Sequence, residues 1–191
     1  MSRVCVTADD FGLRAENDRV IVDLARARRL DAVAVMVHAD AALEHVAALR
    51  AHVTTGLHLV LIGERPLRPE PLRALLDRDG RLPAAWPALF AAIVRRPSML
   101  EAIRLEVGAQ LDRFASLGLT LGFVNAHQHA HLFPAVWPLV RAELAARSLA
   151  PAVRVAAGMR PKELALVAAQ RVAFATSGPP EGSTLVAHGL A

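Results

Sequence analysis

The sequence predicts an α/β fold in which a parallel β-sheet is covered by helices. Short apolar runs of strand length alternate with longer segments whose apolar residues recur at helical spacing. Glycine and proline residues separate these segments at most of the junctions. The chain has 191 residues, which fits one domain, so we treat residues 1–191 as a single unit.

The first part of the chain predicts a β-α-β-α-β unit. A β-prone run at residues 3–8 ends at two aspartates, and a helical pattern follows at residues 17–30. Residues 32–37 form a continuous apolar run, as expected for a parallel strand that is buried on both faces. A second helix at residues 41–51 and a third strand at residues 54–61 complete the unit.

The second part of the chain predicts a helical insert and a return to the sheet. Residues 62–71 contain glycine and three prolines and should form a loop, after which a largely helical insert occupies residues 72–117. A fourth strand is expected at residues 119–126. A helix is expected at residues 134–147, a strand at residues 152–156 and a further helix at residues 161–174. Residues 175–191 show little periodicity.

The composition excludes several classes of protein. The net charge is +4, from 22 basic and 18 acidic residues, and the basic residues are scattered, so we expect no nucleic-acid partner. No apolar run is long enough to span a membrane, and the N-terminus lacks a signal-peptide pattern, so we expect a cytoplasmic protein. Cys5 is the only cysteine, which excludes an internal disulfide, and we expect it to be buried.

Side chains of the metal-ligand type follow three of the predicted parallel strands. Asp9 and Asp10 follow the first strand, His58 lies toward the end of the third, and His127 follows the fourth. Sites in α/β proteins gather at the carboxyl ends of parallel strands, so these residues should meet at one rim of the sheet. The sequence therefore predicts a metal-dependent hydrolase.

The residue types at this rim allow more than one interpretation. If residues 127–131 are extended, His127, His129 and His131 lie on one face, and two histidines with one aspartate leave positions open on a divalent metal for water and substrate. Of the two aspartates, one would ligate and the other act as a base, or both would cap a helix. His58 taken alone is also consistent with a buried histidine of the core. His38 ends the second predicted strand, where it would support one of the metal ligands.

Three motifs resemble those of the YdjC-like carbohydrate deacetylases, the family that includes chito-oligosaccharide deacetylase. They are TADDFG at residues 7–12, GLHL at residues 56–59 and NAHQHAHL at residues 125–132. The last is most similar to the hopanoid-biosynthesis-associated branch, usually labelled HpnK. The resemblance covers roughly residues 4–134, and the three motifs stand in the family's order.

The resemblance implies an irregular (β/α) TIM-like barrel that removes acetyl from an N-acetylated amino sugar, either small or lipid-linked. It implies that a divalent metal, Mg or Zn, is bound by Asp10, His58 and His127. Asp9 matches the general base, and His129 or His131 would be the proton donor or a supporting residue.

The chain also departs from the family pattern. Many members carry histidine where this chain has Phe123 and aspartate where it has Asn125. Members usually continue past the length of this chain, so we expect an incomplete barrel with an exposed parallel edge, which a homodimer would cover. A shortened, inactive paralogue that binds metal or sugar, and a metal-dependent phosphoesterase or amidohydrolase, are the alternatives.

Overall fold

Six strands form one parallel sheet in the computed structural model, which describes residues 4–38, 45–156, 161–180 and 184–187. The strands are β1 Thr7–Phe11, β2 Ala32–Val35, β3 Thr54–Leu59, β4 Phe123–Ala126, β5 Ala152–Ala156 and β6 Thr184–Ala187. They are hydrogen-bonded in chain order, and every neighbouring pair is parallel. The predicted α/β fold with parallel strands is therefore confirmed.

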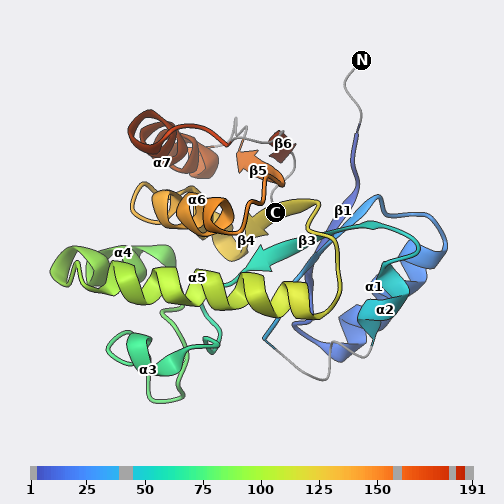
Figure 1. The fold of residues 1–191 in the computed structure, drawn as a ribbon, viewed down its shortest axis with the longest axis horizontal. Coiled ribbons are helices and arrows are strands. Elements are labelled where there is room, and N and C mark those ends of the chain that lie inside the picture. Colours follow the sequence, from blue (N-terminus) through green and yellow to red (C-terminus); the bar gives the residue numbers. More distant parts are fainter. Residues whose placement is uncertain (1–3, 39–44, 157–160, 181–183, 188–191) are drawn as a thin grey trace.

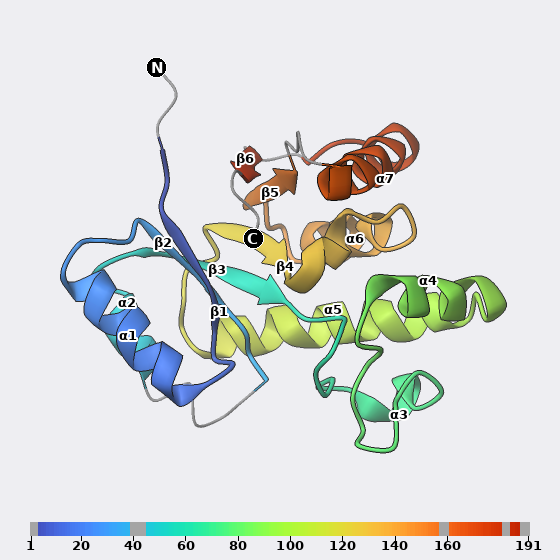
Figure 2. The same cartoon turned by 180° about the vertical axis from the view of Figure 1, so that it is seen from behind.

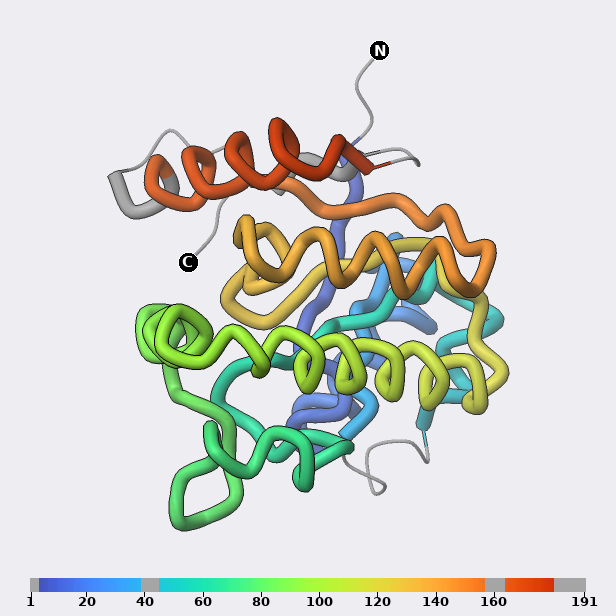
Figure 3. Tube along the Cα trace, turned by 60° about the vertical axis from the view of Figure 1, so that its left-hand side comes forward, coloured from blue at the N-terminus to red at the C-terminus, as the bar shows by residue number. Residues whose placement is uncertain are grey.

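The helices connect the strands and pack against the sheet (Figure 1). They are α1 Ala15–Arg26, α2 Val46–Leu49, α3 Pro69–Leu72, α4 Trp86–Arg95, α5 Met99–Ser116, the 3₁₀ helix η2 His127–Leu132, α6 Trp137–Ala146 and α7 Pro161–Ser177. Because crossovers between parallel strands are right-handed, strands in chain order carry their connecting helices on one face. Figure 3 shows α5, α6 and α7 as three successive layers along this face.

Parallel strands that pair in chain order are typical of a (β/α) barrel, but the described strands form an open sheet. Among the described strands, β1 pairs only with β2 and β6 pairs only with β5. The helical insert between β3 and β4 contains α3, α4 and α5, and β3 runs toward it in Figure 2. None of the described helices is both long and apolar enough to cross a membrane.

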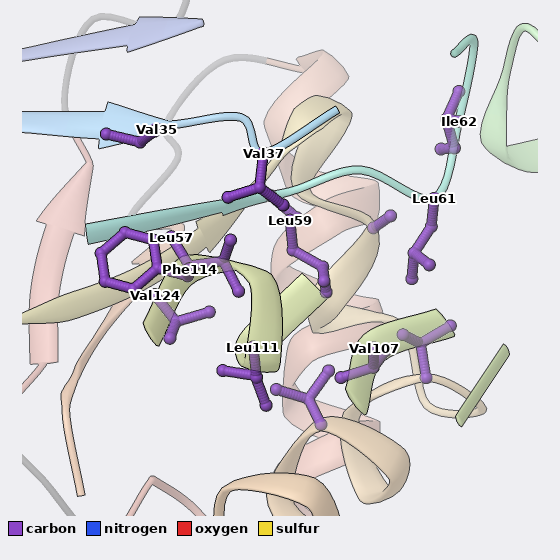
Figure 4. Packing of buried hydrophobic residues seen from close by; sticks show 14 of the residues in the cluster. Val35, Val37, Leu57, Leu59, Leu61, Ile62, Val107, Leu111, Phe114 and Val124 are labelled. Carbon is purple, nitrogen blue, oxygen red and sulfur yellow. The ribbon is translucent and has the colours of Figure 1, made fainter. Parts of the chain in front are cut away.

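The outer face of the sheet packs against the helices and forms the main core (Figure 4). Val35, Leu57, Leu59 and Val124 project from the strands, and all four are buried. They belong to the same cluster as Val107, Leu111 and Phe114 of α5. Burial of apolar surface contributes roughly 25 cal/mol per Å², so this layer is the main source of stability.

The inner face of the sheet is different, because small residues line its amino-terminal half. Ala32, Ala34 and Phe123 form a separate buried cluster there. Gly56 makes room for the Phe123 ring, since a Cβ at that position would lie 2.5 Å from the ring. Alternation along β3 and β4 then directs His58 and Asn125 to this same face, nearer the carboxyl ends.

Several predicted element bounds were wrong. The first strand begins at Thr7 and includes both aspartates, because Thr7 is the first residue paired with β2. Cys5 lies before the first residue paired with β2 and is exposed, so the prediction that it is buried is wrong.

Other differences concern the middle and the end of the chain. The fourth strand begins at Phe123 rather than at residue 119. Just before it, the Gly122 N–H donates both to the Thr120 carbonyl, in a turn, and to the Thr55 carbonyl of β3. Of the helix expected at residues 41–51, Val46–Leu49 is observed, and residues 39–44 lie outside the described ranges. The tail contains the strand β6, whose four residues are too few to show a periodic pattern.

Candidate metal centre

Asp10 reaches the site because the end of β1 is irregular. The register with β2 shifts between Ala8 and Phe11, and Asp10 has a φ of 60°. Such a left-handed residue in a bulged strand re-aims its side chain. Gly12 follows with a φ of 100°, and its N–H donates to the buried Asp18 carboxylate at 2.8 Å, which fixes the turn.

Three potential ligands converge at the carboxyl ends of β1, β3 and β4. One donor atom each from Asp10, His58 and His127 lies within 4.8 Å of the other two. Asp10 Oδ1 is 3.1 Å from His58 Nε2 and 3.2 Å from His127 Nδ1. The two imidazole rings stand nearly perpendicular, with centroids 5.8 Å apart.

The electrostatics of this cluster favour a charged carboxylate. The close contacts of its carboxylate with the His127 ring and then with the His58 ring hold the pKa of Asp10 well below its usual value, against the effect of burial. The same contact with Asp10 raises the pKa of His127, again against burial. The Asp10 carboxylate therefore stays ionised, which is the form that binds a cation.

Asn125 fixes the orientation of His58. Asn125 Nδ2 donates to Asp9 Oδ1 at 3.0 Å, and a carboxylate can only accept, so the amide oxygen of Asn125 must face His58. That oxygen lies 2.8 Å from His58 Nδ1, which therefore carries the hydrogen.

The lone pair of His58 Nε2 is consequently directed at the Asp10 carboxylate. This nitrogen is buried and makes no well-formed hydrogen bond. Two electron-rich atoms 3.1 Å apart repel each other unless a proton or a cation lies between them. A donor set of two imidazoles and one carboxylate, with a supporting hydrogen bond on the far nitrogen, fits a divalent metal such as Zn or Mg.

Arg154 is the functional residue that sequence reasoning missed. Its guanidinium forms a two-pronged ion pair with Asp9, in which Nη1 contacts Oδ2 at 2.6 Å and Nη2 contacts Oδ1. This pairing holds the plane of the carboxylate and leaves lone pairs on Asp9 for another donor. The available signal was a single charged residue at the centre of the otherwise apolar run of β5.

The predicted extended arrangement of the three histidines is wrong. Residues 127–132 form the 3₁₀ helix η2, and Gln128 and His129 within it adopt left-handed φ values of 50° and 56°. Only His127 therefore joins the ligand cluster.

His131 faces into the protein. Its ring is fully buried, and Nε2 donates to the carbonyl oxygen of Arg154 at 2.9 Å. Burial lowers the pKa of His131 to about 3, so the ring is neutral over the physiological range. His129 is half-buried on the same segment.

The other histidines that the structure describes lie outside this cluster. His38 faces the buried Glu106 at 3.5 Å rather than any of the three ligands. Glu106 also accepts the backbone N–H groups of Leu67 and Arg68, at 3.0 and 2.7 Å, and so anchors the loop after β3. His52 is exposed, and His188 lies outside the described residues.

Comparison with known proteins gives consistent matches. The family model described as YdjC-like protein matches residues 3–184. A carbohydrate deacetylase from Geobacillus stearothermophilus is 35% identical over 171 residues, which is 87% of this chain and 65% of that protein. A chitooligosaccharide deacetylase from Proteus mirabilis is 35% identical over 76% of this chain and 56% of its own length.

A mouse carbohydrate deacetylase is 36% identical over 70% of this chain and 44% of its own length. The chain thus spans about half to two thirds of the curated relatives that it matches.

Solved structures support the fold. An Enterococcus faecalis protein, whose name refers to cellobiose-phosphate cleavage, has a TM-score of 0.66 at 19% identity, over 87% of this chain and 63% of that one. The lactam utilization protein of Thermus thermophilus has a TM-score of 0.52 at 14% identity, over 97% of this chain and 66% of that one.

Proposed function

The chain belongs to the YdjC-like family, and on that premise we propose that it is a metal-dependent hydrolase that removes the acetyl group from an N-acetylated amino sugar. The observation that carries the proposal is the convergence of Asp10, His58 and His127 at the carboxyl ends of three strands. The names of the relatives supply the substrate class, since they are carbohydrate and chitooligosaccharide deacetylases.

In this proposal Asp10, His58 and His127 hold the metal and Asp9 is the general base. A divalent ion supplies a Lewis acid that polarises an acetamide carbonyl and lowers the pKa of water. Asp9 accepts the proton of the attacking water, and Arg154 keeps its carboxylate oriented for that transfer.

The departing sugar amine needs a proton, because an amide nitrogen is a poor leaving group without one. We assign this proton to His129. His131 is less suited to the role, because its Nε2 hydrogen is already donated to the Arg154 carbonyl inside the protein. His131 instead fixes η2 to β5.

The experiment is a measurement of acetate release from a panel of N-acetylglucosamine, its oligosaccharides and a lipid-linked N-acetylglucosamine, with a phosphate ester included. We expect acetate release that a chelator abolishes and that Zn or Mg restores. A His127→Ala variant should lose this activity because one ligand is missing. Phosphate release, or full activity of His127→Ala, would contradict the proposal, and a folded protein without any activity would favour the binding paralogue.

A further inference from the structure

A segment of the insert between α3 and α4 is fixed across the rim that carries the ligands. Residues 82–86 form a short strap between two loops. On one side, Leu82 N–H donates to the Glu64 carbonyl at 2.9 Å and Gly63 N–H donates to the Pro83 carbonyl at 3.0 Å. On the other side, the Gln128 side chain donates to the Ala84 carbonyl at 3.1 Å.

These two loops follow β3 and β4, the strands that deliver His58 and His127. The strap therefore lies beside the candidate metal centre and is held there by backbone contacts. Glu64 is also close enough for its charge to act on His127.

Trp86 ends the strap and is half-exposed at the rim. Its indole stacks on the Phe133 ring, with centroids 5.0 Å apart and planes 28° from parallel. Phe133 directly follows η2, which begins with His127. Trp86 keeps 41% of its surface exposed, whereas Trp137, the other tryptophan, is 1% exposed. A large aromatic ring left open to solvent at the edge of a site is a common element of ligand recognition.

We propose that Trp86, backed by Phe133, is a stacking platform for a second pyranose ring of the saccharide, next to the ring that is deacetylated. This inference rests on the proposed function. A pyranose presents an apolar C–H face that covers an indole, and its hydroxyl groups need polar partners at the edge. Glu64 in the loop after β3 and Arg81, which directly precedes the strap, supply such partners; a 2.7 Å ion pair joins them, and both are partly exposed.

Saccharide binding at Trp86 can be followed by tryptophan fluorescence, because the chain has only two tryptophans. The chain contains no tyrosine, and Trp137 is enclosed, with its indole N–H bonded to the Gly178 carbonyl at 2.8 Å. A change of tryptophan fluorescence on adding a saccharide therefore reports Trp86. We expect a saturable change with N,N′-diacetylchitobiose in the Zn-loaded chain, and no change in Trp86→Phe, which retains an aromatic platform but not the indole.

Calorimetric titration with the saccharides measures how much Trp86 contributes to the free energy of binding. Stacking contacts contribute about 1 kcal/mol, so Trp86→Ala should bind the disaccharide about five- to tenfold more weakly. The loss should be smaller for N-acetylglucosamine, which has no second ring. Phe90→Ala is the matched control, because Phe90 lies one turn further along α4 and is 46% exposed. This control should bind both sugars as the unaltered chain does.

The outcomes separate this inference from the proposed function. Equal disaccharide affinity of Trp86→Ala and Phe90→Ala, or calorimetric binding with no fluorescence change, would overturn the platform even if acetate is released. Absence of saturable disaccharide binding by the folded, unaltered chain would also overturn it. Trp86-dependent binding without acetate release would support the platform and contradict the deacetylase. Circular dichroism and thermal unfolding of Trp86→Phe establish that the variant is folded.

Discussion

The two faces of the sheet differ in what their side chains do. The outer face is apolar and packs against the helices, from Val35 and Leu57 to Leu111 of α5. The inner face has small residues in its amino-terminal half and a polar network near the carboxyl ends. That network joins Arg154, Asp9, Asn125 and His58, in this order, by ion pairs and hydrogen bonds.

The outer face of the sheet therefore contributes mainly to stability, and the inner face carries the residues of the candidate metal centre. Neighbouring residues of one strand have different roles: in β3, Leu57 belongs to the main core and His58 to the candidate metal centre. Changes on the outer face should therefore alter stability while metal affinity is retained, and changes on the inner face should do the reverse. The predictions below test this separation.

The largest effect is expected from Leu111→Ala on the outer side. Leu111 is 4% exposed within the main core, so its truncation should lower the free energy of unfolding by about 2–5 kcal/mol. Urea unfolding measures this, and calorimetry with Zn should show unchanged affinity in the folded protein. Val20→Ala, at a position 58% exposed on α1, is the control and should change stability by less than about 0.5 kcal/mol.

The next effect is expected from Arg154→Ala on the inner side. Loss of the guanidinium leaves Asp9 without its ion-pair partner, so kcat for acetate release should fall by about 100-fold. Zn affinity should change little, because Arg154 contacts no proposed ligand. Added guanidinium should partly restore kcat by occupying the vacated space. A loss of Zn affinity as large as the loss of kcat, with no rescue, would assign Arg154 a merely structural role.

A smaller effect is expected from Asn125→Leu, which removes the acceptor for His58 Nδ1. Supporting hydrogen bonds of this kind contribute about 10- to 100-fold to metal affinity. Calorimetric titration with Zn should detect that loss, with the midpoint of thermal unfolding of the metal-free chain little changed. Asn125→Asp keeps an acceptor for His58 and should lose less affinity. Equal losses in both variants would argue against the assigned tautomer.

The last effect is the pH dependence of stability through His131. Its pKa is lowered from 6.5 to about 3 in the folded chain, so the unfolded chain binds the proton more readily. Stability should therefore fall as the pH decreases from 6.5 toward 3, by ~1.4 kcal/mol per pH unit within that window. His131→Gln keeps a donor for the Arg154 carbonyl and should show a shallower slope between pH 6 and pH 4. An unchanged slope would assign the acid sensitivity to other groups.

Local sequence patterns were enough to predict the alternation of strands and helices and the three strand ends that carry Asp10, His58 and His127. These features follow from local patterns, because burial on one side of a strand or helix imposes a period that is visible in the chain. The rim was predictable for the same reason, since parallel strands present their carboxyl ends at one edge.

The pairing of the polar residues at that rim depends instead on contacts between distant parts of the chain. Asp9 and Arg154 are 145 residues apart, and their contact depends on the register and curvature of the whole sheet. The 3₁₀ course of η2, which separates His127 from His131, likewise depends on the enclosed hydrogen bond to β5. Local patterns could not reveal either feature, because each arises from packing between distant segments rather than from the periodicity of one.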